Sequence, residues 1–92
     1  MSKREDILKE ARQIVCNDRN TQYGEPEDNF ACIAEFWSVY TGLELKSYDV
    51  ALMMVLFKMA RLISGSYKHD SVVDLIGYAA CAEDCVEEQT WA

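Results

Sequence analysis

The sequence predicts an all-α fold, a compact bundle of four helices in one domain that spans residues 1–92. Apolar residues recur at helical spacing in four segments, short polar links separate these segments, and no segment shows the alternation that is typical of a strand. Half of the residues are hydrophobic, a high share for a chain this short, so we expect a homodimer or a higher homo-oligomer. The expected helices cover about residues 3–16, 26–41, 48–64 and 70–88.

The first expected helix runs from Lys3 to about Cys16. Ser2 and Glu5 form a capping-box pattern at its start. Its apolar residues fall on one face and its charged residues on the opposite face, so we expect one side to pack and the other to meet water. The apolar face comprises Ile7, Leu8, Ala11, Ile14 and Val15.

The segment from Asn17 to Pro26 is expected to be a loop, because it is polar and rich in turn-forming residues. Two interpretations of its side chains Arg19 and Tyr23 are open. In one, Arg19 contacts a phosphate and Tyr23 stacks on a base, since loops beside helix starts often form ligand sites. In the other, Arg19 pairs with surface carboxylates and Tyr23 packs over the first helix.

The second expected helix begins at Pro26, which suits the first helical position, and ends at Gly42. Glu27 and Asp28 lie in the first turn, where the helix dipole favours acidic side chains. The dipole alone accounts for both, but they are also candidates for holding a metal ion with carboxylates from a facing helix. The expected core face comprises Phe30, Ile33, Ala34, Trp37 and Tyr40.

The third expected helix is the most apolar segment of the chain. Eight consecutive apolar residues, Val50 to Phe57, leave its first half without a polar face, so the rest of the domain or a second copy must surround it. Ser47 is the expected N-cap, and Gly65 is the expected stop. Lys58 and Arg61 follow on one stripe, too early for a membrane span. A buried helix that ends in two cations requires negative partners nearby.

The fourth expected helix runs from about Asp70 to Glu88 and carries one polar stripe. Asp70 and Asp74 lie one turn apart, and Gly77 inside the helix indicates the close approach of another helix or a ligand. Two aspartates at this spacing can share a divalent cation, and Mg²⁺ prefers carboxylate oxygens, water and phosphate. His69, just before this helix, is expected to be an exposed neighbour of the cap.

The candidate site combines Lys58 and Arg61 with Asp70 and Asp74. In a functional interpretation, the two cations bind phosphate oxygens, with Arg61 bidentate, and the aspartates hold Mg²⁺. In a structural interpretation, the same side chains form ion pairs between helices. Buried ion pairs stabilise only weakly, so they are often retained for other reasons. We favour the functional interpretation because these polar residues gather at helix ends and on single stripes.

Composition argues against several classes of protein. The net charge of −7 disfavours a general nucleic-acid binder, which needs a basic surface, but it is compatible with a nucleotide bound together with a metal. The charged start of the sequence shows no targeting signal, so we expect a cytoplasmic protein without a membrane partner. The four cysteines lack the paired spacing of a zinc site and are expected to be small apolar residues in a reduced protein.

Six runs of the sequence carry a family resemblance: Asp18-Arg19, Tyr23-Gly24, Pro26-Glu27-Asp28-Asn29-Phe30, Asp49-Val-Ala-Leu-Met-Met, Lys58-Met-Ala-Arg61 and Asp70…Asp74-Leu-Ile-Gly-Tyr-Ala-Ala. Together they resemble a family of short, functionally uncharacterised helical proteins from tailed phages and prophages. The resemblance covers nearly the whole chain, to about Glu83, and implies a phage origin and action in the host cytoplasm. It implies no particular activity.

The run Asp70-Ser-Val-Val-Asp74 is also similar to one acidic pair of the MazG-type all-α nucleoside-triphosphate pyrophosphohydrolases. That resemblance implies helical dimers or tetramers that release pyrophosphate, with Mg²⁺ held by an acidic pair on each of two helices. The other pair, two glutamates three residues apart, is not intact here. Glu27 and Asp28 with Glu35 would replace it at a different spacing. This departure from the motif argues against hydrolysis but not against nucleotide binding.

The predicted function is therefore nucleotide binding by a phage protein. If the protein is an enzyme, it is expected to be a Mg²⁺-dependent nucleoside-triphosphate pyrophosphohydrolase. One alternative is a non-catalytic binder that sequesters a nucleotide signal of host defence, and another is a structural or inhibitory interaction module. The expected catalytic residues are Glu27, Asp70 and Asp74. The expected metal ligands are Glu27, Asp28, Asp70 and Asp74. The expected nucleotide contacts are Arg19, Tyr23, Asn29, Lys58 and Arg61.

Overall fold

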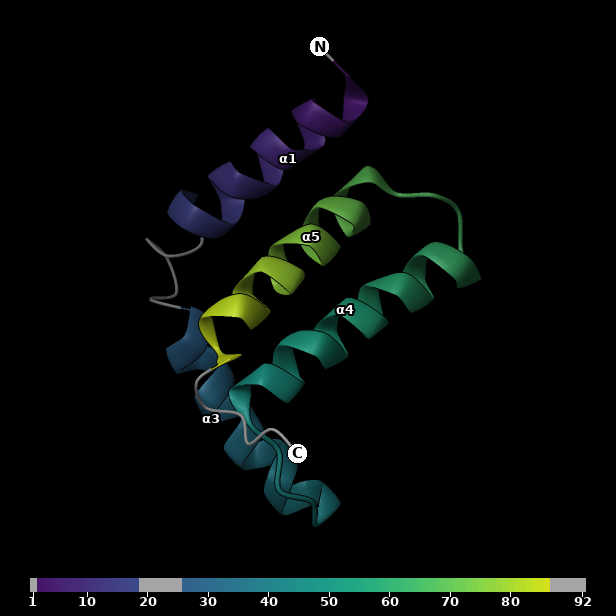
Figure 1. The fold of residues 1–92 in the computed structure, drawn as a ribbon. Helices are drawn as coiled ribbons and strands as arrows, with labels where there is room; N and C mark the ends of the chain where they lie inside the picture. Colours follow the sequence, from purple (N-terminus) through teal and green to yellow (C-terminus); the bar gives the residue numbers. More distant parts are fainter. Residues whose placement is uncertain (1, 19–25, 87–92) are drawn as a thin grey trace.

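The computed structural model of the protein describes residues 2–18 and 26–86. Within these two ranges the chain is helical and contains no strand, which confirms the all-α prediction (Figure 1). The π-helix η1 directly continues α1, so the expected number of four helices is also confirmed. The elements are α1 (Lys3–Gln13), η1 (Ile14–Asp18), α3 (Pro26–Thr41), α4 (Ser47–Ser64) and α5 (His69–Asp84).

The start of α1 agrees with the predicted cap. The Ser2 hydroxyl accepts a hydrogen bond from the Glu5 backbone N–H at 3.2 Å and donates one to Glu5 Oε1 at 3.3 Å. The serine half of the capping box is therefore present. Ala11 is the buried residue of α1, whereas Leu8, predicted to pack, is exposed. This difference follows from the packing of α1, which among the described elements is covered by one neighbouring helix, α5.

The end of α3 is fixed by Gly42, as predicted. Gly42 adopts a φ of 76°, in the left-handed region that favours glycine, and its N–H donates to the Ser38 carbonyl at 2.9 Å. The Ser38 hydroxyl in turn accepts a bond from the Leu45 N–H at 2.9 Å, which ties the following link to α3. Tyr40, predicted to be in the core, is exposed, because the last turns of α3 extend beyond the other helices (Figure 1).

The start of α4 differs from the prediction. Lys46 is the N-cap, and its backbone N–H donates to Asp49 Oδ2 at 2.9 Å. Ser47 is the first helical residue, and its buried hydroxyl has no hydrogen-bond partner within the described ranges. The prediction that Ser47 caps this helix is therefore wrong. The helix starts one residue earlier than predicted: the Val50 N–H already donates to the Lys46 carbonyl at 3.1 Å, and the Asp49 carboxylate at the positive end of the helix dipole accepts the Lys46 N–H.

The fourth predicted helix is shorter in the structure. α5 ends at Asp84 rather than near Glu88, and residues 87–92 are outside the described part of the chain. Glu83 and Asp84 place negative charge at a helix end where the dipole favours cations, which disfavours continuation. Inside α5, a Cβ on Gly77 would lie 3.7 Å from the Val15 Cβ of η1. The predicted close approach of another helix at Gly77 is therefore confirmed.

α5 lies between α1 on one side and α4 on the other (Figure 1). The antiparallel α4 and α5 form the most extensive helix–helix contact, and α3 packs across the start of α4. In the described ranges, α1 packs against α5 and its own continuation η1 alone. The main core therefore lies where α3, α4 and α5 converge. Its buried residues are Phe30, Ala34, Val50, Ala51, Cys81, Ala82 and Cys85.

Candidate functional site

The candidate site is the α4–α5 polar cluster, which we define as Lys58, Arg61, Asp70 and Asp74. Lys58 Nζ lies 3.0 Å from Asp74 Oδ2 and forms an ion pair that joins α4 to α5. The two side chains are only 16% and 18% exposed. The interior of the helix pair therefore holds one cation and one carboxylate of the cluster, which we call the inner pair.

Helical spacing explains why the inner pair is enclosed. Lys58 shares a face of α4 with the buried residues Ser47 and Ala51, whereas Asp74 shares a face of α5 with the buried residues Cys81 and Cys85. Because these two faces are directed inward, both charges are largely, though not fully, removed from bulk water. The attraction between the charges has to offset the desolvation of each of them.

Arg61 and Asp70 form the exposed part of the cluster, which we call the outer pair. Arg61 Cζ lies 5.5 Å from the centre of the Phe57 ring, and Lys58 Nζ lies 5.6 Å from the same ring centre. Both cations therefore lie within the distance at which a cation is attracted to an aromatic ring. Asp70 is exposed in the first turn of α5. The outer pair can therefore meet a solute without rearrangement of the core.

An interaction that sequence reasoning missed joins α1 to α5 beside the cluster. His69 Nε2 lies 2.6 Å from Glu10 Oε2, and both side chains are substantially exposed. The hydrogen bond to the Glu10 carboxylate raises the pKa of His69 above its ordinary value, and the negative charge of Asp70 acts in the same direction. The prediction that His69 is exposed is confirmed, but no signal in the sequence indicated its partner in α1.

The polar stripe of α5 continues past the cluster towards α3. Tyr78 lies one turn beyond Asp74, and its ring centre is 6.0 Å from that of the buried Phe30. This contact brings the first turns of α3 next to the stripe. Asp28 and Asn29 are exposed there, whereas the side chain of Glu27 is outside what the structure describes, as are the predicted loop contacts Arg19 and Tyr23.

The described carboxylates do not by themselves complete a site for Mg²⁺. No three side chains of His, Cys, Asp or Glu come together closely enough to hold a metal ion in residues 2–16 and 28–86. Asp74 is engaged by Lys58, and Asp70 lies at the exposed edge of the cluster. None of the four cysteines is part of a disulfide; Cys81 and Cys85 are buried, and Cys16 and Cys32 are exposed.

The outward side of α4 is a second notable feature of the described domain. The sequence predicts that this helix is surrounded, and Val50 and Ala51 are indeed fully buried. Farther along, however, Leu56 and Ile63 are exposed to solvent. The described part of the domain therefore covers only one side of the most apolar helix. No helix of the described residues is long and apolar enough to cross a membrane.

These observations define a small all-helical domain with a polar cluster between two antiparallel helices and an uncovered apolar helix face. The chain belongs to the family described as a domain of unknown function, DUF6378, whose sequence profile matches residues 6–86. The family match covers every described helix except the first residues of α1. No solved structure matches the chain.

Two phage proteins are similar to most of the chain. It is 43% identical over 84 residues to the Gene 55 protein of Mycobacterium phage D29, which covers 91% of this chain and 56% of that protein. It is 41% identical over 78 residues to the Gene 55 protein of Mycobacterium phage L5, a match that covers 84% of this chain and 50% of that protein. The chain thus spans about half the length of these relatives. The predicted phage family is confirmed, whereas nothing in the comparisons supports the MazG-type resemblance.

Proposed function

We propose that this chain is a phage protein that binds the phosphate groups of a nucleotide at the α4–α5 polar cluster, in the cytoplasm of the host cell. The observation that carries the proposal is the inner pair of Lys58 and Asp74, which is largely enclosed between α4 and α5. Apolar residues of similar volume are often as stable as a buried ion pair, or more so. A need for charge at this position accounts for the retention of the pair.

The two cations of the cluster suit the recognition of phosphate. Lys58 supplies a compact positive charge, and Arg61 supplies a planar fork of donors that matches two phosphate oxygens. A phosphate that approaches from the exposed side meets Arg61 first and then competes with Asp74 for Lys58. Lys58 remains compensated when phosphate takes the place of Asp74, but the Asp74 carboxylate then loses its cation, a cost that the phosphate contacts have to offset.

The remaining predicted contacts complete the proposal. Arg19 would bind a second phosphate, Tyr23 would stack on the base, and Asn29 would contact the nucleotide from the start of α3. Magnesium would accompany the nucleotide, with Asp70 as the accessible carboxylate of the cluster. The described residues alone supply no group of three metal ligands, so hydrolysis would require further ligands from the nucleotide or from water.

The proposal is tested by titrating the chain with a panel of nucleoside triphosphates, with and without Mg²⁺, in a calorimeter, and by separating the products by chromatography. We expect saturable binding that weakens at least about tenfold in Arg61→Ala, as expected for a lost charged hydrogen bond. Binding without products identifies the sequestering form, and release of pyrophosphate identifies the enzymatic form. No binding by the wild-type chain contradicts the proposal.

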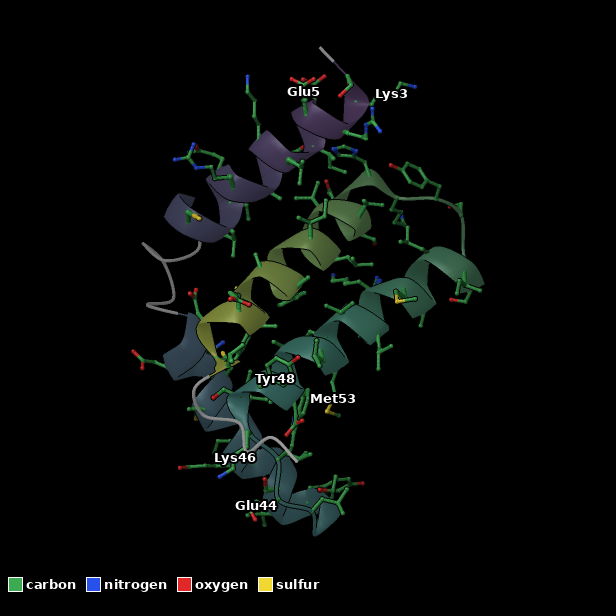
Figure 2. The ribbon with its side chains drawn as sticks, in the orientation of Figure 1. Lys3, Glu5, Glu44, Lys46, Tyr48 and Met53 are labelled. Atoms are coloured by element: carbon green, nitrogen blue, oxygen red, sulfur yellow. The ribbon has the colours of Figure 1, made fainter. Side chains whose placement is uncertain are left out.

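A matched control separates a specific loss from a general change in charge. Lys46 is a cation at the opposite end of α4, paired with Glu44 at 3.1 Å in the exposed link that follows α3 (Figure 2). Lys46→Ala removes the same charge as Arg61→Ala, at a distance from the cluster. We expect Lys46→Ala to bind nucleotides as the wild-type chain does. Equal weakening in both variants would indicate non-specific attraction of anions.

A second candidate is an interaction module that binds another protein and no nucleotide. The exposed apolar residues favour it, notably Phe36 and Tyr40 on α3, which are 71% and 91% exposed. Large exposed apolar side chains that lie together typically mark contact surfaces. The absence of binding in the titration with every nucleotide selects this candidate.

A further inference from the structure

The outward side of α4 carries a continuous stripe of large apolar side chains. We define the α4 apolar stripe as Leu52, Met53, Leu56, Met59 and Ile63. These side chains are between 39% and 80% exposed. Figure 2 shows Met53 on the side of α4 that faces away from α5. The stripe is therefore directed away from the core to which the opposite side of α4 contributes.

The spacing of the stripe is that of a helix–helix interface. Leu52, Leu56, Met59 and Ile63 follow one another at intervals of four, three and four residues. Apolar residues at these intervals form the seam through which two helices pack in a coiled coil. The stripe therefore presents an unoccupied seam on the outside of the described domain.

Charge is excluded from this seam. The charged residues of α4 are Asp49, Lys58 and Arg61. Asp49 caps the helix, Lys58 points into the contact with α5, and Arg61 lies beside the Phe57 ring. In a chain with 16 acidic residues and a net charge of −7, two copies repel each other over most of their surfaces. A face without acidic residues is where they can meet at the lowest electrostatic cost.

The size of the stripe is also in the range that association requires. At about 200 Å² for a large side chain, the exposed fractions correspond to on the order of 500 Å², near the upper end of the roughly 300–600 Å² for the largest apolar patch on a typical monomer. A standard interface takes about 800 Å² from each partner. The stripe with its flanking residues Phe57 and Ala60 supplies most of that area.

We propose that a second copy of this chain covers the α4 apolar stripe, with α4 of one copy packed against α4 of the other in a symmetric dimer. An uncharged apolar seam is complementary to itself, so one patch serves both partners of an isologous contact. This interface accounts for the two sides of α4: the inner side packs in the domain core, and the outer side packs against the partner copy. The proposal does not depend on nucleotide binding.

The test is sedimentation equilibrium of the wild-type chain and of a double variant, Leu56→Glu with Ile63→Glu. We expect the wild type to show twice the chain mass of 10.5 kDa and the double variant to show the single-chain mass. Circular dichroism checks that the double variant remains helical. Leu8→Glu introduces one such negative charge at an exposed leucine of α1, away from the stripe, and should remain dimeric.

Two results would overturn the dimer. One is a wild-type chain that stays at the single-chain mass at every concentration at which it is soluble, which would leave the stripe to another occupant, such as the additional half of the longer relatives. The other is a double variant that is folded and still dimeric. If the double variant does not fold, Leu56→Gln, which adds no charge, takes its place and should weaken dimerisation at least about tenfold.

Discussion

The Val15 Cβ in η1 lies 3.7 Å from the position that a Cβ on Gly77 would occupy in α5. This distance is an ordinary van der Waals contact, so the approach of η1 leaves room for one methyl group and for little more. Glycine in the middle of a helix costs about 1 kcal/mol relative to alanine. Gly77 therefore lowers the stability of the helix at a position where the packing would also accept alanine.

We expect Gly77→Ala to raise the free energy of unfolding by about 1 kcal/mol, because the added methyl group fits and the helix gains propensity. Gly77→Leu should lower it, since a larger side chain displaces Val15 and with it the contact of η1 with α5. Urea denaturation followed by circular dichroism measures both changes. Destabilisation by the alanine variant would show that Val15 of η1 lies closer to Gly77 than the 3.7 Å contact allows.

The contact between His69 and Glu10 predicts a dependence of stability on pH. Hydrogen bonding to Glu10 raises the pKa of His69 in the folded chain above the ordinary value of 6.5. Protonated His69 therefore stabilises the folded state. The stabilisation is fully present below the pKa of the unfolded chain and is lost as the pH rises through the higher pKa of the folded chain.

The measurement compares urea denaturation of the wild type with that of His69→Gln from pH 5 to pH 8. We expect the stability of the wild type relative to the variant to decrease over the upper part of this range. Glu10→Gln should remove most of the same pH dependence, because it removes the partner that raises the pKa of His69. A difference between wild type and His69→Gln that is constant with pH would contradict the assignment.

The inner pair predicts strong coupling between Lys58 and Asp74. Lys58→Met leaves the Asp74 carboxylate enclosed without its cation, so we expect a loss of about 2–4 kcal/mol in the free energy of unfolding. Lys58→Met combined with Asp74→Leu removes both charges and should recover most of this loss. A double-mutant cycle from chemical denaturation gives the coupling energy. Additive effects of the two substitutions would show that the interaction between Lys58 and Asp74 contributes nothing to the free energy of unfolding.

The buried hydroxyl of Ser47 predicts a stabilising substitution. Burying a hydroxyl group without a partner costs roughly 1–3 kcal/mol in proteins. Ser47→Ala removes the hydroxyl and should raise the free energy of unfolding by about 1 kcal/mol or leave it unchanged. Ser38→Ala is the matched control and should be destabilising, because Ser38 accepts the bond from Leu45 that holds the link after α3. Thermal melts of the three proteins make the comparison.

Local rules were sufficient to predict the helices. The cap at Ser2, the end of α3 at Gly42 and the close approach at Gly77 each follow from the chemistry of one or two neighbouring residues, and the structure confirms all three. The prediction at Ser47 was wrong because the helix starts one residue earlier, with the Lys46 N–H bonded to Asp49 and the Val50 N–H bonded to the Lys46 carbonyl. Residue preferences identify a helix start only to within about one or two residues.

Contacts between distant helices could be predicted only as alternatives. The sequence indicated that Lys58 has a negative partner, and the structure identifies it as Asp74. Which carboxylate would pair with it depends on how α4 and α5 are aligned, which no local pattern specifies. The partner of His69 was missed for the same reason, since Glu10 lies 59 positions away. The exposure of Tyr40 likewise depends on how far α3 extends beyond its neighbours.

The attachment of α1 to α5 has a consequence for biosynthesis. The residues joined by the contact between Glu10 and His69 are 59 positions apart, and in the described ranges α1 packs against no helix that precedes α5 except its own continuation η1. As the ribosome extends the chain, α1 emerges before α3 and α4 but finds its neighbour only after both have been translated. Its apolar side therefore stays open to water, and to chaperones, until synthesis has passed α5.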